Sequence, residues 1–172
     1  CNLKCIFCVQ QKIKYDISEE LSVKKFIDIT EEICKMGVKR FLISGGGEPL
    51  ASPIKTLAIM NVIKMYKGEG RLITNGTLFT QKIIEKMINM EWDTVVFSLH
   101  GTRSFHDFLT NHKGSFDKVV KNIELINRYK KKKKSRVPHL EFTFVLNKIN
   151  LNEVPKMVKL AGELEVESLN IE

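Results

Sequence analysis

The chain has 172 residues, enough for one domain with a hydrophobic core of its own. Hydrophobic residues make up 43% of it and charged residues 28%, which is ordinary for a globular protein. No apolar run approaches the roughly 18 residues that a membrane span needs, so we expect no membrane segment. Because neither a signal peptide nor an initiator methionine precedes Cys1, we expect a fragment of a longer protein, with one domain over residues 1–172.

Helical and strand patterns alternate along the whole chain. A first helix is expected after Ser18, a favourable N-cap, and Gly37 ends it. Another begins at Pro53, at a position where the missing N–H of proline costs least. Apolar spacing predicts strands at 41–44, 71–74, 94–99, 140–146 and 168–171, and further helices around 83–88, 116–126 and 154–160.

The expected strands are continuous apolar runs. Such runs are typical of strands buried on both faces, as in a parallel sheet covered by helices. A complete eight-stranded barrel takes about 250 residues, which is more than this chain has. We therefore expect an α/β fold, a partial (βα)6 TIM-like barrel with parallel strands, in which five strands lie within the chain and the first is missing upstream of Cys1.

Three cysteines, Cys1, Cys5 and Cys8, lie within the first eight residues. Thiols this close make a poor disulfide framework but a good metal-binding loop, which favours a reducing, cytoplasmic location. Four thiolates would close a zinc site or complete a cubane iron–sulfur cluster. Three leave one iron of a cubane without a protein ligand, and that open iron is a place for a substrate or cofactor to bind.

The remaining cysteine and the histidines leave alternatives open. Cys34 falls in an apolar helical pattern, so we interpret it as a buried structural thiol, with a fourth cluster ligand as the alternative. A zinc site is also compatible with the cysteine loop, and its fourth ligand would then come from His100, His106 or His112.

Polar and glycine-rich residues follow three of the expected strands. Gly45 to Pro49 follow the first, Asn75-Gly76 the second, and Ser98 ends the third. Each has a structural alternative as a turn or a cap. In parallel α/β proteins, however, ligands bind at the carboxyl ends of the strands, so these segments and the cysteine loop converge on one mouth. There the glycines allow close backbone approach to a ligand, and Glu48 adds a carboxylate that can hold an ammonium.

The order of these motifs resembles the radical S-adenosylmethionine (radical SAM) family. The resemblance rests on Cys-x3-Cys-x2-Cys, then Gly46-Gly47-Glu48-Pro49, Thr74-Asn75-Gly76 and Ser98, and it covers essentially the whole chain. It implies the same partial (βα)6 barrel. It also implies a radical SAM core domain.

The resemblance implies a role for each motif. Cys1, Cys5 and Cys8 would hold a [4Fe-4S] cluster, and S-adenosylmethionine would chelate its fourth iron. The segment Gly46, Gly47, Glu48 and Pro49 would receive the methionyl ammonium. Phe7 matches a position that commonly packs near the adenine. Asn75 and Ser98 would face the methionyl carboxylate or the ribose.

The function implied is reductive cleavage of S-adenosylmethionine to a 5′-deoxyadenosyl radical, which takes hydrogen from a substrate. That substrate would be a small molecule or a peptide, and a flavodoxin or ferredoxin would donate the electron. The alternative is a non-catalytic iron–sulfur or zinc-binding barrel that serves electron transfer or structure.

Two groups of charged or titratable residues need an interpretation of their own. The run Lys130 to Lys134 accounts for much of the net charge of +8. We expect it to be a solvated loop between a helix and a strand, on the side opposite the mouth, and binding of nucleic acid is the less favoured alternative. After the third strand, His100, Arg103, His106 and Asp107 are candidates for substrate contact. Capping of the next structure is the alternative for His106 and Asp107.

Overall fold

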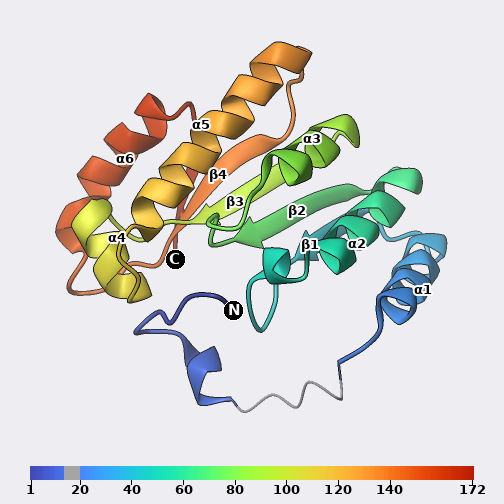
Figure 1. Cartoon of the computed structure of the whole chain (residues 1–172), viewed down its shortest axis with the longest axis horizontal. Helices are drawn as coiled ribbons and strands as arrows, with labels where there is room; N and C mark the ends of the chain where they lie inside the picture. Colours follow the sequence, from blue (N-terminus) through green and yellow to red (C-terminus); the bar gives the residue numbers. More distant parts are fainter. Residues whose placement is uncertain (14–19) are drawn as a thin grey trace.

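A parallel sheet forms the centre of the molecule in the computed structural model, which describes residues 1–13 and 20–172. The sheet has five strands in the order β1-β2-β3-β4-β5, and every neighbouring pair is parallel (Figure 1). The strands are β1 Arg40–Ile43, β2 Glu69–Thr74, β3 Thr94–Ser98, β4 His139–Phe144 and β5 Ser168–Ile171. Strands that follow one another in sequence are neighbours in the sheet, so the predicted α/β partial barrel is confirmed.

Helices join the strands. They are α1 Val23–Lys35, α2 Pro53–Met65, α3 Gln81–Asn89, α4 Arg103–Thr110, α5 Ser115–Lys133 and α6 Val154–Glu163, with short 3-10 turns at Val9–Lys12, Pro49–Ala51 and Leu151–Glu153. Figure 1 shows α2, α3 and α5 side by side along one face of the sheet. In the described part of the chain, no helix combines the length and the apolar character needed to cross a bilayer.

The hydrophobic core lies between that face of the sheet and the helices. Leu72, Val95, Phe97, Leu140 and Phe142 alternate along β2, β3 and β4 and are all fully buried. The opposite face of β2 and β4 is more polar and includes the ion pair of Arg71 with Glu141. The sequence predicts strands that are buried on both faces. Most of β3 is buried in this way, whereas buried and less buried residues alternate along β2.

Two helices differ from the expectation. Ser18 lies outside the described residues, and the first helix begins at Val23, where Ser22 Oγ accepts the N–H of Lys25 at 3.2 Å. The short helix α4 was not predicted from sequence. It begins after Thr102, a residue type that favours the N-cap, although the Thr102 hydroxyl donates to Glu153 and does not cap the helix.

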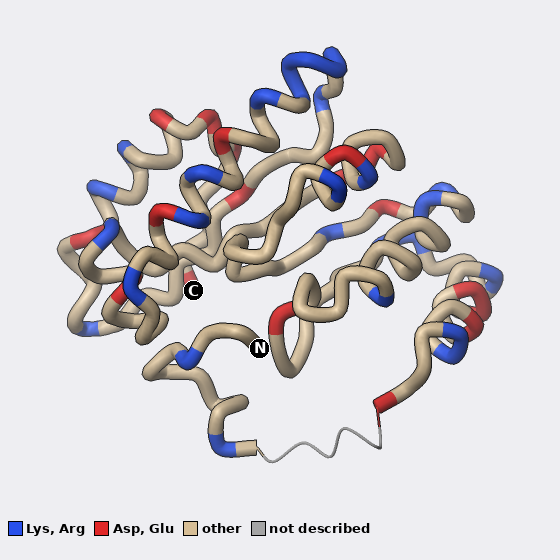
Figure 2. The backbone as a smooth tube through the Cα atoms, in the orientation of Figure 1, with Lys and Arg blue, Asp and Glu red and all other residues tan. Residues whose placement is uncertain are grey.

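The lysine run is part of a helix, which corrects the prediction of a loop. Lys130 to Lys133 form the last turn of α5, where cations stabilise a helix, and Lys134 ends it with a φ of 53°. Lys131 pairs with Glu165 at 2.6 Å and Lys130 with Glu167 at 3.2 Å. Figure 2 shows this charged end of α5 far from the N-terminal segment, at the edge of the sheet where the strands begin.

Candidate active site

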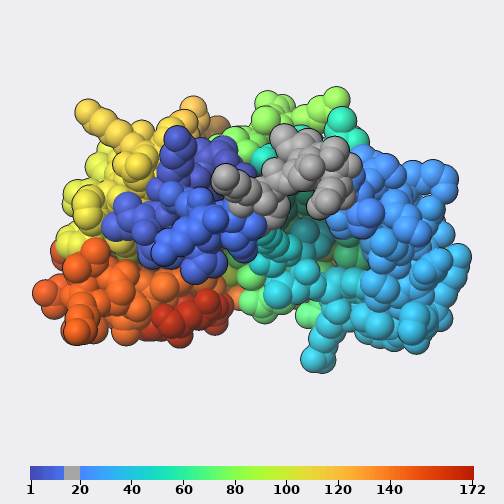
Figure 3. Space-filling model, turned by 90° about the horizontal axis from the view of Figure 1, so that it is seen from below, coloured from blue at the N-terminus to red at the C-terminus, as the bar shows by residue number. Residues whose placement is uncertain are grey.

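The cysteine loop lies across the carboxyl ends of the strands. The side chain of Leu3 is buried, and the N–H of Ile6 donates to the carbonyl of Leu109 in α4 at 2.9 Å. Figure 3 shows this N-terminal segment seated against α4. These two anchors hold a loop that has little regular structure of its own.

All four cysteines are free thiols. Cys1 is exposed, while Cys5 and Cys8 are half-buried, and the N–H of Cys8 donates to the carbonyl of Cys5 at 3.0 Å. Burial is the main cause that raises the pKa of the Cys5 thiol, and the neighbouring Cys8 thiol raises it as well. Cys34 is buried in α1, as predicted, and burial raises the pKa of its thiol as well.

The glycine segment meets the cysteine loop at Cys1. A Cβ added to Gly47 would lie 3.2 Å from the backbone nitrogen of Cys1, so the two backbones are in close approach. Over the described ranges, no three His, Cys, Asp or Glu side chains gather closely enough to hold a single metal ion. Three thiols on one loop beside a close-fitting glycine segment are the donor set that an iron–sulfur cluster with one open iron takes. The residues present therefore fit that group.

Glu48 is buried, and its carboxylate accepts hydrogen bonds from donors of the protein itself. Oε1 accepts the N–H of Leu50 at 3.0 Å and the hydroxyl of Thr74 at 2.6 Å, and Oε2 accepts the N–H of Asn75 at 2.7 Å. A carboxylate has about four acceptor positions, so about one is left for a ligand. Glu48 thus fixes the loop after β1 to the end of β2.

Replacing Glu48 with alanine is expected to destabilise the fold by about 3 kcal/mol, because buried donors without an acceptor cost about 1–3 kcal/mol each and some will reach water. Urea unfolding followed by circular dichroism measures the effect. The matched control is Glu124→Ala on the exposed side of α5, which should change stability by about 0.5 kcal/mol or less. Equal effects of the two substitutions would show that the Glu48 carboxylate does not hold the loop.

Asn75 joins the end of β2 to the cysteine loop. Its side-chain nitrogen donates to Asn2 Oδ1 at 2.8 Å and lies 3.9 Å from the sulfur of Cys1. Asn2 in turn donates to the hydroxyl of Thr77 at 2.9 Å. Of the residues predicted from sequence, Cys1, Gly47, Glu48 and Asn75 are therefore brought together by direct contacts.

Phe7 and Ser98 lie elsewhere along the mouth. The ring of Phe7 meets the ring of His100 edge to face, with centroids 5.0 Å apart and an angle of 85° between the planes. Ser98 is half-buried at the end of β3, opposite Thr143 of β4. Phe7 thereby links the cysteine loop to the segment that follows β3.

The two histidines behind Phe7 are buried and neutral. His100 Nδ1 accepts the N–H of Val145 at 3.2 Å, and His106 Nδ1 accepts the N–H of His100 at 3.4 Å. Burial lowers the pKa of His100 to about 4. The pKa of His106 is lowered to about 3, mainly by burial and in addition by the neighbouring His100. His106 Nε2 is buried and has no hydrogen-bond partner within the described part of the protein. Both rings are therefore part of the wall of the mouth.

Asp107 serves as a cap, which was the structural alternative for it. It accepts the N–H of Gly114 at 2.6 Å, the N–H of Phe116 at 2.9 Å and the hydroxyl of Ser115 at 2.9 Å, at the start of α5. Burial alone would raise the pKa of Asp107, but these hydrogen bonds lower it overall. Arg103 is exposed and pairs with Asp117.

Two residues of this edge were missed from sequence. Asn150 is fully buried and donates to the carbonyl oxygens of His100 at 3.2 Å and Val145 at 2.9 Å. Glu153 is buried too and accepts from the N–H of Thr102 at 2.7 Å and from Lys156 at 2.6 Å. Both follow β4, so the search for polar residues after strand ends would have found them if it had included β4.

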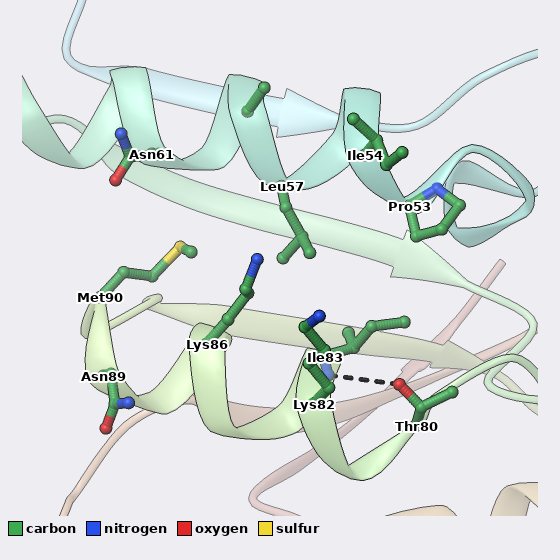
Figure 4. Close-up of a pocket in the computed structure, with 11 residues that line it drawn as sticks. Pro53, Ile54, Leu57, Asn61, Thr80, Lys82, Ile83, Lys86, Asn89 and Met90 are labelled. Carbon is green, nitrogen blue, oxygen red and sulfur yellow. Dashed lines mark hydrogen bonds between the residues drawn. The ribbon is translucent and has the colours of Figure 1, made fainter.

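A groove of about 820 Å³ lies between α2 and α3, on the outside of the fold. Figure 4 shows Leu57 of α2 and Lys86 of α3 reaching toward each other across it. None of the site residues predicted from sequence lines this groove, so it is separate from the mouth.

Comparison with known proteins identifies relatives of the chain. The family model of the Radical SAM superfamily matches residues 1–161. The AdoMet-dependent heme synthase of Methanosarcina barkeri is 29% identical over 172 residues, which are 95% of this chain and 45% of that protein. The cysteine-type anaerobic sulfatase-maturating enzyme of Clostridium novyi is 30% identical over 148 residues, 76% of this chain and 38% of that protein.

The fold has a close match among solved structures. The crystal structure of Streptococcus suis SuiB bound to precursor peptide SuiA superposes with a TM-score of 0.77 at 18% sequence identity, over 99% of this chain and 36% of SuiB. The chain thus spans less than half the length of each of these three proteins. Members of the matched superfamily use a [4Fe-4S] cluster and S-adenosylmethionine. Because the family model covers almost the whole chain, the protein belongs to the radical SAM superfamily, as the order of its motifs predicts.

Proposed function

We propose that residues 1–172 form the core domain of a radical SAM enzyme. When bound, the cluster would supply the electron that cleaves S-adenosylmethionine to a 5′-deoxyadenosyl radical, which takes hydrogen from a substrate. The observation that carries this proposal is the meeting of three segments at Cys1, namely the cysteine loop, the glycine segment and the loop of Asn75. A barrel used only for structure has no need of this convergence.

Each residue has a task in this proposal. Cys1, Cys5 and Cys8 hold the cluster. Glu48 shapes the glycine segment, and with about one acceptor position left it contributes to binding the methionyl ammonium together with the backbone of Gly46 and Gly47. Pro49 begins the 3-10 turn that ends this segment.

The aromatic and strand-end residues complete the proposed site. Phe7, which is 40% exposed, offers a ring face for the adenine. Ser98 is proposed to face the ribose or the methionyl carboxylate, whereas the side-chain amide of Asn75 at the same edge is already bonded within the protein. The buried, neutral pair His100 and His106 keeps charge and water away from the wall behind Phe7.

The substrate is proposed to be a peptide or a small molecule. A sulfatase-maturating relative and a SuiB structure bound to a precursor peptide support the peptide, while a heme synthase relative supports the small molecule. The electron would come from a reduced flavodoxin or ferredoxin, and free thiols with an oxygen-labile cluster suit the cytoplasm.

The test is S-adenosylmethionine cleavage by the full-length protein, reconstituted with iron and sulfide without oxygen and reduced with dithionite. We expect 5′-deoxyadenosine by chromatography and an EPR signal that changes when S-adenosylmethionine is added. A cluster-replete protein that shows neither result would instead support the non-catalytic barrel.

A further inference from the structure

The side-chain amide of Asn75 has a fixed orientation. Its oxygen accepts the N–H of Thr77 at 3.0 Å and the hydroxyl of Thr77 at 2.7 Å. Its nitrogen donates to Asn2 Oδ1 at 2.8 Å. The reversed amide would place its NH₂ against the N–H of Thr77, so the hydrogen-bond network determines which atom is nitrogen.

One N–H of that nitrogen is left for the sulfur of Cys1. An amide nitrogen carries two N–H groups, and Asn2 takes only one of them. The sulfur of Cys1 lies 3.9 Å from the nitrogen. The backbone of Asn75 is held separately, because its N–H donates to Glu48 at 2.7 Å. The donor is therefore held beside the sulfur from both its backbone and its side chain.

We propose that Asn75 donates a hydrogen bond to the sulfur of Cys1 and thereby raises the reduction potential of the cluster that Cys1 helps to hold. Reduction adds negative charge to a cluster and its sulfurs, and an N–H dipole aimed at a sulfur stabilises the reduced form more than the oxidised form. Asn75 is in this sense a positioning residue that acts through Cys1. The inference rests on the proposed function, because it requires the cluster.

The experiment is an EPR-monitored redox titration of the full-length, reconstituted protein in the absence of S-adenosylmethionine. Asn75→Ala removes the donor without adding charge. Asn75→Asp keeps an oxygen for Thr77 but replaces the donor with a charged acceptor. We expect a lower potential in both variants, and in Asn75→Asp a fall of about tenfold in the equilibrium constant for reduction, equivalent to about 59 mV for one electron.

Thr77→Val is the matched control, because it removes the hydroxyl hydrogen bonds to Asn75 and Asn2 but leaves the N–H beside the sulfur. It should keep the wild-type potential. The inference is overturned if Asn75→Ala keeps that potential, or if Thr77→Val shifts it as much. Wild-type protein that takes up no iron and sulfide would overturn the proposed function itself, whereas cluster-replete variants with unchanged potentials would overturn only this inference.

Discussion

Replacing Cys5 with alanine is expected to abolish formation of 5′-deoxyadenosine. Cys5 is the central thiol of the loop, and its backbone carbonyl accepts the N–H of Cys8. With two thiolates left, two irons of a cubane would lack a protein ligand, so the cluster would be lost or labile. Iron and sulfide content, visible absorption and chromatography of the products measure the result.

The control for this substitution is Cys34→Ala. Cys34 is equally free of disulfides but is buried in α1, away from the mouth, so its loss should cost some stability and leave cleavage intact. The cluster assignment would be wrong if Cys5→Ala retained both iron and turnover, or if Cys34→Ala lost them while remaining folded.

Acid is expected to destabilise the fold well above the range in which carboxylates titrate. The pKa of His100 is about 4 and that of His106 about 3, both below the ordinary value of about 6.5, so the unfolded chain binds more protons than the folded one below pH 6.5. Stability is therefore present at pH 7 and falls as the pH falls. At about 1.36 kcal/mol per pH unit, each histidine accounts for about 2 kcal/mol between pH 7 and pH 5.

The combined loss of about 4 kcal/mol is a large part of an ordinary domain's stability. Burial is the largest cause of the low pKa of His106. His100 lowers that pKa further and Asp107 raises it, so the two neighbours oppose each other. The lowered pKa values of Asp107 and Glu153 cause a further loss, but only below the ordinary carboxyl pKa of about 4.

Urea unfolding at pH 7 and pH 5 separates the two histidines from other groups. The double variant H100N/H106N should be less stable at pH 7 but should lose little between the two pH values. The control His139→Asn, at an exposed position at the start of β4, should keep the wild-type loss. A wild-type protein that is equally stable at both pH values would contradict the assignment of these rings as buried and neutral.

The sheet could be predicted from local patterns because its strands are short apolar runs between glycines, prolines and polar residues. All five expected strands lie within two residues of the observed ones, for example 140–146 against His139–Phe144. Parallel order then follows, because each pair of strands is separated by a helix. The same order brings the strand-end motifs to one edge, which is why Cys1, Gly47 and Asn75 were found as neighbours.

What could not be predicted depends on contacts between distant residues. The ligand role expected of Glu48 stays a proposal, but its three donors within the protein were not foreseen, and two of them are 26 and 27 residues away in sequence. Glu153 meets Thr102 across 51 residues. No local pattern carries such pairings, since they follow only from how the loops pack over the sheet.

Hydrogen bonds at the two ends of α4 connect the segment after β4 to the cysteine loop. Glu153 accepts the N–H of Thr102 at the start of α4. Near the other end of this helix, the carbonyl of Leu109 accepts the N–H of Ile6 in the cysteine loop. A short helix moves as a rigid unit, so a displacement of the segment after β4 would also displace α4 and the cysteine loop bonded to it. The position of the cysteine loop therefore depends on the segment after β4 as well as on the loop's own contacts.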